Sequence, residues 1–198
     1  MMLIELTTVP ASALPVAEFR DHLRLGSGFA EEAAEDSLLE ALLRAAISAV
    51  EARTAKALLE RDFALTLRAW RDGTLQPLPV APVGAVSALY QMDADTAETA
   101  LDSTAWTLVT DTHCPEIKGA AGQLPPVPTG GAVRIEFTAG YGANWSDVPA
   151  DIAHAVMLLA ATYYEYRHES SNAAAIMPHG VAALLEPHRA LRLGGGRV

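Results

Sequence analysis

Cysteine is nearly absent from this sequence: Cys114 is the single one among 198 residues. One thiol cannot form an intrachain disulfide, and it cannot supply the several thiolates of a typical structural zinc site. We therefore expect synthesis in a reducing compartment and no redox role. Hydrophobic residues make up 51% of the chain and charged residues 19%, a composition that excludes general disorder.

Basic residues are also scarce. The chain has 14 Lys and Arg against 24 Asp and Glu, which gives a formal net charge of −10. Proteins that bind nucleic acid by neutralising phosphates need a basic surface, so the composition disfavours that class. DNA could pass near such a protein without binding to it.

Long apolar runs are missing as well. Residues 1–10 contain Glu5 and no Lys or Arg, so the features of a secretory signal are not present there. The best apolar run, residues 155–161, is far shorter than the roughly 20 residues of a membrane helix. We expect a soluble protein of one domain, or a helical domain that carries a smaller insertion.

Helical periodicity marks four segments. A short helix is expected before Gly26, which we predict to be its left-handed cap, and a long helix follows with Asp36 as its N-cap. A second long helix is expected after Pro149, and a short one around Val181. The stripe of the first long helix contains Leu39, Leu43, Ala46, Val50, Thr54 and Ala57, and that of the second contains Ile152, Val156, Leu159, Tyr163 and Tyr166.

After Glu60 the hydrophobic pattern has a period of two residues. Apolar residues occupy every second position of 63–69, as in a strand with one solvated face. Further short strands are predicted at 86–90, 106–109 and 133–137. Prolines restrict residues 78–83 to an edge or connector. Residues 111–131, rich in proline and glycine, are predicted to form a loop.

These elements predict an α+β fold that is mainly α, a bundle of two long and two short helices with a small inserted β subdomain. The expected parts are an N-terminal helical part (residues 1–60), the β insertion and loops (61–146), a C-terminal helical part (147–190) and a flexible tail (191–198).

Residues that suggest a metal site form only incomplete sets. His113 and Cys114 are neighbours in a loop, and no second cysteine completes four ligands. Glu165 and His168 lie three apart, yet carboxylate-bridged metal sites need partner motifs from other helices. We predict neither a metal nor a cofactor.

An enzyme is a second interpretation with little support. Ser170, His168 and Asp147 could be written as a hydrolytic triad, but no Gly-x-Ser-x-Gly motif accompanies them. The tyrosines at 163, 164 and 166 could stack on a ligand, although aromatic residues at helical spacing are more often core. A small helical hydrolase or ligand-binding protein therefore stays as an alternative, and the prediction is no enzyme.

A resemblance to a known family rests on the order and spacing of several short sequence segments, called landmarks below. They are FRDHLRL (19–25), LPVAPV (78–83), VSALY (86–90), VRIEFTAGYG (133–142), VPADI (148–152), YYEYR (163–167) and MPHGV (177–181). With them the chain resembles the head-to-tail connector (adaptor) proteins of long-tailed phages and gene transfer agents. It departs from the family near the end of the first long helix, where a glycine is expected and Ala55 and Lys56 stand.

The resemblance implies a structural adaptor in the neck of an assembled particle, made in the bacterial cytoplasm. It implies a ring of about twelve copies that contacts the portal, neighbouring adaptor copies and a head-closure or neck protein, and that lets DNA pass without specific binding. A head-closure or tail-completion protein is the alternative, although such proteins are usually predominantly β.

Two groups of residues are candidates for interaction. The acidic start of the long helix would ordinarily be a solvated helix terminus, and in a ring it is a candidate channel face. The basic C-terminal end is a candidate surface for portal or subunit docking, or a flexible tail. The acidic group is Glu31, Glu32, Glu35 and Asp36, and the docking group is Arg189, Leu191, Arg192 and Arg197.

Overall fold

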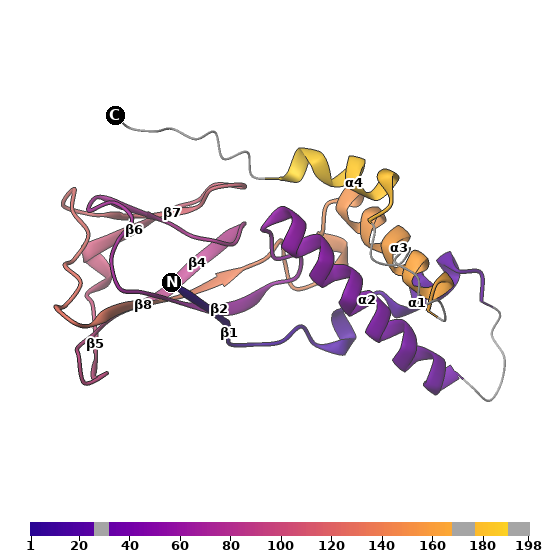
Figure 1. Cartoon of the computed structure of the whole chain (residues 1–198), viewed down its shortest axis with the longest axis horizontal. Coiled ribbons are helices and arrows are strands. Elements are labelled where there is room, and N and C mark those ends of the chain that lie inside the picture. The colour runs from indigo at the N-terminus through magenta and orange to yellow at the C-terminus, as the bar shows by residue number, and fades with distance from the viewer. Residues whose placement is uncertain (26–31, 168–176, 190–198) are drawn as a thin grey trace. The chain divides into compact units, whose positions relative to one another are not determined.

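The computed structural model describes residues 1–25, 32–167 and 177–189, and the chain divides into two compact units (Figure 1). The β unit consists of Met1–Val9 and Lys56–Ala143. The helical unit consists of Pro10–Ala55 and the described residues from Asn144 onward.

The helical unit contains four described α-helices and three short 3₁₀ turns. Pro149 and Pro178 directly precede the third and fourth helices, where a missing N–H costs nothing because it would have no helical partner. The helices are α1 (Val16–His22), α2 (Glu32–Thr54), α3 (Ala150–Glu165) and α4 (His179–Leu185), and the turns are Ala11–Ala13, Trp145–Asp147 and Glu186–His188.

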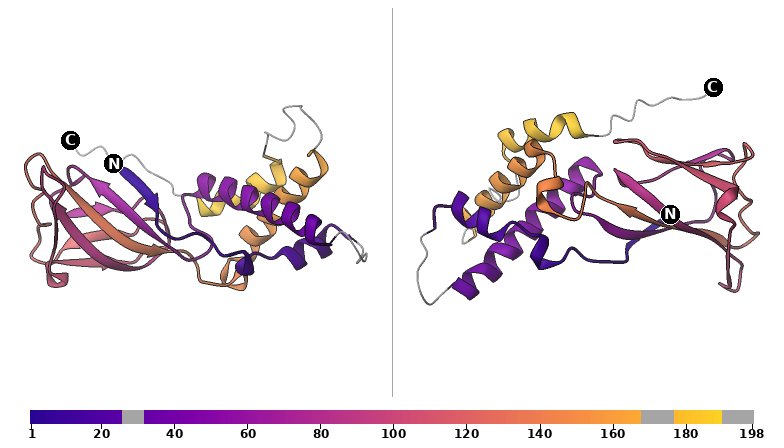
Figure 2. Two further views of the ribbon diagram at one scale, coloured as in Figure 1. Left: turned by 90° about the horizontal axis from the view of Figure 1, so that it is seen from below. Right: turned by 180° about the vertical axis from the view of Figure 1, so that it is seen from behind.

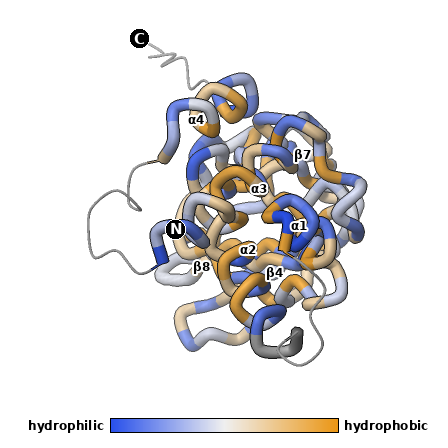
Figure 3. The backbone as a smooth tube through the Cα atoms, turned by 90° about the vertical axis from the view of Figure 1, so that its right-hand side faces the viewer, coloured by the Kyte–Doolittle hydropathy of each residue, from blue (hydrophilic) through white to orange (hydrophobic). Residues whose placement is uncertain are grey.

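The apolar stripes of α2 and α3 form the core of this unit. Leu43, Ala46 and Val50 are fully buried, as predicted, and α2 packs along α3. Much of the trace of α3 is hydrophobic (Figure 3), because α2 and α4 both pack on it. Within the described residues, no helix has the length and apolarity needed to cross a membrane.

The helix ends differ from the prediction. Asp36 lies inside α2, which begins at Glu32, so it is not the N-cap. The left-handed residue after α1 is Arg24, at φ 55°, whereas Gly26 lies outside the described residues. Ala55 follows α2 at φ 56°, and its N–H donates to the carbonyl of Glu51 at 2.8 Å. This is a left-handed helix cap, the position where glycine is favoured.

The β unit contains two antiparallel sheets. A five-stranded sheet has the order β1-β2-β8-β4-β5, and a three-stranded sheet has the order β3-β7-β6. The strands are β1 (Met2–Glu5), β2 (Arg61–Leu67), β3 (Leu75–Pro77), β4 (Val83–Met92), β5 (Glu98–Ala100), β6 (Trp106–Val109), β7 (Glu116–Gly119) and β8 (Ala132–Ala139). Figure 2 shows these strands from two further sides.

Both sheets contribute to one hydrophobic core. Strand β8 alternates strictly, so that Val133, Ile135 and Phe137 are buried while the residues between them are partly exposed. Phe137 stacks on Phe63 of β2 with ring centroids 5.6 Å apart. Ile117 of β7 brings the three-stranded sheet to the same core.

Gly140 ends β8 at a point where no side chain fits. Its φ is +142°, and a Cβ atom there would lie 2.4 Å from Cα of Glu60. The N–H of Gly140 donates to the carbonyl of Pro82 at 3.0 Å. Close approach of three chain segments therefore requires glycine at this position.

The predicted fold class, a mainly helical bundle with a small β insertion, is wrong. The β part is a unit of two sheets with its own core, and it includes an N-terminal strand, β1, that the sequence analysis did not assign. The predicted loop at residues 111–131 contains β7. Strands of three or four residues, such as β3, β5 and β7, are too short for a clear period in the sequence.

Candidate interaction surfaces

The acidic start of α2 contacts a basic side chain. Arg20 of α1 donates a hydrogen bond from Nη2 to Oδ1 of Asp36, and its Nη1 lies 3.8 Å from Oε2 of Glu35. The Arg20 side chain is mostly buried, whereas that of Asp36 is half exposed. These contacts hold α1 against α2 and offset part of the local negative charge. Glu31 lies outside the described residues, and the side chain of Glu32 is not described.

One of the four residues predicted for docking is described. Arg189 follows the last 3₁₀ turn and donates from Nη1 to both carboxylate oxygens of Glu186 at 3.1 Å. Both side chains are exposed. Leu191, Arg192 and Arg197 lie outside the described residues, as does the predicted flexible tail, residues 191–198.

The candidate metal residues in the 111–114 loop stabilise a turn. The backbone N–H groups of His113 and Cys114 both donate to Oδ1 of Asp111 at 2.7 Å, and these bonds lower the pKa of Asp111. The ammonium group of Lys56 donates to the carbonyl of Thr112. Throughout residues 1–25, 32–167 and 177–189, no three His, Cys, Asp or Glu side chains are placed to hold a metal.

The residues of the enzyme alternative are not brought together among the described residues. Asp147 caps a 3₁₀ turn, where its carboxylate accepts from the backbone N–H of Asn144 at 2.9 Å. His168 and Ser170 lie outside the described residues. The prediction that the tyrosines are core is wrong, since Tyr163 and Tyr164 are only half-buried and Tyr166 is exposed.

A hydrogen bond joins the 3₁₀ turn after α4 to the first turn of α3. His188 Nε2 contacts Oδ2 of Asp151 in the first turn of α3. Burial raises the pKa of Asp151, whereas the hydrogen bonds from His188 and from the N–H of Ile152 lower it, and the net pKa is below its ordinary value. The pair therefore holds the segment after α4 against α3.

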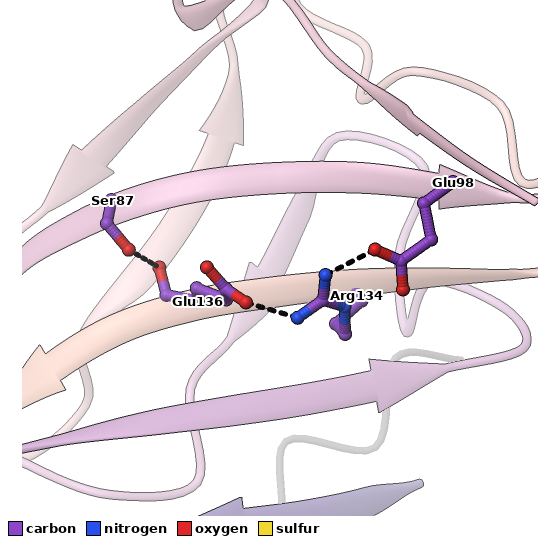
Figure 4. A network of polar contacts seen from close by, with 4 residues as sticks. All are labelled: Ser87, Glu98, Arg134 and Glu136. Carbon is purple, nitrogen blue, oxygen red and sulfur yellow. Dashed lines mark hydrogen bonds and ion pairs between the residues drawn. The ribbon is translucent and has the colours of Figure 1, made fainter. Parts of the chain in front are cut away.

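The outer face of the five-stranded sheet carries a network of charged side chains (Figure 4). Arg134 of β8 donates to Glu98 of β5 and to Glu136 of its own strand, and its guanidinium lies 4.5 Å from the ring centre of Tyr90. Ser87 Oγ of β4 donates to the carbonyl of Glu136 at 3.1 Å. The hydrogen bond with Glu98 is the largest of the effects that raise the pKa of Arg134. This face is polar, and its charges are largely paired.

The largest exposed apolar side chains are concentrated in the first six residues. Strand β1 is an edge of the five-stranded sheet, and all four of its residues are exposed. Sequence reasoning missed this surface, although the run MMLI was visible as an apolar segment without charge. The exposed apolar residues there are Met1, Met2, Leu3, Ile4 and Leu6.

Solved structures of gene transfer agent (GTA) particles contain similar chains. A chain from the neck of an empty GTA particle with C6 symmetry is 56% identical, at a TM-score of 0.90. A chain from the neck of a native GTA particle with C12 symmetry is 52% identical, at a TM-score of 0.86. A chain from the virion of a native GTA particle is 56% identical, at a TM-score of 0.87. Each match covers 100% of both chains.

The sequence matches no protein-family model and no curated protein. Identity above half over the whole length, together with the same fold, is far beyond what a shared architecture alone would produce. It also agrees with the landmarks that run from the first helix to the last. The chain therefore belongs to the head-to-tail connector (adaptor) family of long-tailed phages and gene transfer agents.

Proposed function

We propose that this chain is a structural adaptor that forms a ring in the neck of a phage or GTA particle, between the portal and the tail-side neck proteins. DNA leaves the head through the centre of this ring. The observation that carries the proposal is the full-length identity of 52–56% to chains from GTA necks and virions. The C6 and C12 symmetries of those necks support assembly as a closed ring.

The proposed role is non-enzymatic, because the function of a ring subunit lies in its surfaces. The fold alone does not separate an adaptor from a head-closure protein, since half of this chain is a β unit. Which neighbours the protein contacts in the particle would separate the two.

Removal of the gene from a producing strain tests the function. Without the chain, we expect filled or empty heads that lack tails, because the next neck protein has no ring to bind. Expression of the chain in trans should restore tailed particles. Normally tailed particles from the deletion strain would overturn the proposal, and detached tails beside intact heads would support it.

The portal is the proposed partner of the C-terminal end, through Arg189, Leu191, Arg192 and Arg197. Guanidinium groups favour bidentate contacts with carboxylates, and they gather here at one end of an acidic chain. Deletion of residues 191–198 should leave the melting temperature of the purified protein unchanged and prevent its attachment to portal-bearing heads. Attachment at the level of the full-length protein would show that the portal binds another surface.

The acidic start of α2 is the proposed channel face. Negative charge along a channel repels phosphate and keeps passing DNA from binding. Arg20 offsets part of this charge, so Glu31 and Glu32 matter more for the proposal than Glu35 and Asp36. We expect no binding of duplex DNA to the purified protein at moderate salt in a fluorescence-anisotropy titration. Tight binding under those conditions would refute the proposed acidic face.

A further inference from the structure

Among the described residues, no strand pairs with the backbone groups on the edge of β1 that faces away from β2. Beside the antiparallel pair of β1 with β2, Leu6 N–H donates to the carbonyl of Asp62 at 2.7 Å. Ile4 and Met2, at every second position from Leu6, therefore also direct their backbone groups toward β2. Backbone groups of an antiparallel strand alternate in direction, so those of Leu3 and Glu5 face away from β2. No other strand of the described residues lies on that side, since β1 ends the sheet order.

Side chains on both faces of β1 are apolar and exposed. Met2, Ile4 and Leu6 point to one face, and Leu3 points to the other, because successive residues of a strand alternate. Leu3 is 38% exposed and Ile4 46% exposed. A strand edge with apolar residues on both faces is an unstable surface in water and a template for pairing with another chain.

Side-chain protections that many edge strands carry are missing from residues 1–4. Natural edges carry lysine, proline or an inward-pointing charge. Residues 1–4 contain none of these, and the one charged residue of β1, Glu5, lies 2.8 Å from Nε of Arg61 in its own sheet. The one charged side chain of β1 is therefore paired within its own sheet.

We infer that the β1 edge is covered by a neighbouring copy of this chain in the ring, an inference that rests on the proposed function. Copies that each carry a net charge of −10 repel one another, so their contact belongs where the surface is uncharged and apolar. Contacts between copies of permanent oligomers are more apolar than the rest of the surface. A ring also joins one patch to a different patch of the next copy, and an open strand edge suits that head-to-tail contact.

A photoreactive residue at position 3 tests which chain covers the edge. Leu3 is replaced by p-benzoylphenylalanine, particles are assembled in a producing strain and irradiated, and the adducts are identified by mass spectrometry. The expected product joins two copies of this chain. A product that joins this chain to a different particle protein, or the lack of any intermolecular product, would overturn the inference.

A matched pair of lysine variants tests the contribution of the edge to assembly. Leu3→Lys places a charge on β1, and Val109→Lys places one on β6, an edge strand of the other sheet, at a residue of nearly equal exposure, 37%. We expect Leu3→Lys to lower the number of copies per particle by about tenfold or more. Val109→Lys should stay within about twofold of the wild type, as surface substitutions usually do.

Equal losses in the two variants, or no loss in Leu3→Lys, would contradict the inference. Circular dichroism of both purified variants checks that each has folded. The proposed function fails separately: in that case the unmodified chain would be missing from the neck of the particle. If the unmodified chain is present there and position 3 crosslinks to another protein, only the β1 inference fails.

Discussion

Replacement of Ala55 by glycine should stabilise the protein. Ala55 has φ 56°, a left-handed conformation that costs a residue with a Cβ roughly 1–2 kcal/mol. Glycine adopts it freely but loses more backbone entropy on folding, by roughly 0.5–1 kcal/mol relative to alanine. The methyl group is exposed, so its removal loses little packing. The difference predicts that Ala55→Gly raises the free energy of unfolding by about 0.5–1 kcal/mol.

The assay is chemical denaturation of the purified chain, followed by the helical circular-dichroism signal. The matched control is Ala45→Gly, the same substitution at an exposed position inside α2. There the helical backbone gains nothing from glycine, so the free energy of unfolding should fall by about 1 kcal/mol. The two variants should therefore shift the denaturation midpoint in opposite directions, with an unchanged slope.

A fall in stability for Ala55→Gly comparable to that of Ala45→Gly would refute the reasoning. It would mean that residue 55 continues the right-handed helix in solution, and that the hydrogen bond from its N–H to Glu51 is an ordinary helical one. The expectation of a glycine near this point in relatives would then lack its structural reason.

Three further predictions concern the two cores and the pH dependence. Leu43→Ala should lower the free energy of unfolding by about 2–5 kcal/mol because the side chain is fully buried, whereas Leu38→Ala on the exposed side of the same helix should cost less than about 1 kcal/mol; equal losses in denaturation would contradict the assigned core face. Gly140→Ala should cost at least about 2–3 kcal/mol or abolish folding, and a wild-type melting temperature would disprove the close approach. Asp151→Asn should lose under about 1 kcal/mol at neutral pH, because the contact with His188 is partly exposed. The pKa of Asp151 is lower in the folded chain, so its contribution is present above the ordinary value of 3.8 and is lost as the pH falls below it; melting curves of variant and wild type that differ equally at all pH values would refute this.

The helical part of the fold could be predicted because its signals are local. The stripe through Leu43, Ala46 and Val50 repeats at helical spacing over many turns, and a helix makes its backbone hydrogen bonds within one segment. The ends of the helices could be predicted less well. Asp36 has a residue type typical of an N-cap, yet its carboxylate pairs with Arg20 from another helix, which local sequence cannot indicate.

The β unit was underestimated because its order depends on pairing between distant segments. Strand β1 pairs with β2, some 60 residues away, and β2 pairs with β8, which lies still further along the chain. No feature within residues 2–5 identifies that partner, and the strand is too short for its alternation to be read. The acidic and C-terminal candidate residues stay predictions, because several of them lie outside the described residues.

The sequence by itself determined the charge balance, the scarcity of cysteine, the two long helical stripes and the landmarks that place the chain in its family. These depend on residue types and on short spacings, which folding does not alter. Tertiary structure alone decided that half of the chain is a two-sheet unit, that Arg20 offsets the acidic start of α2, and that an apolar strand edge is open at β1. Each of these depends on which distant segments meet, and that is set by the joint burial of apolar surface rather than by any one segment.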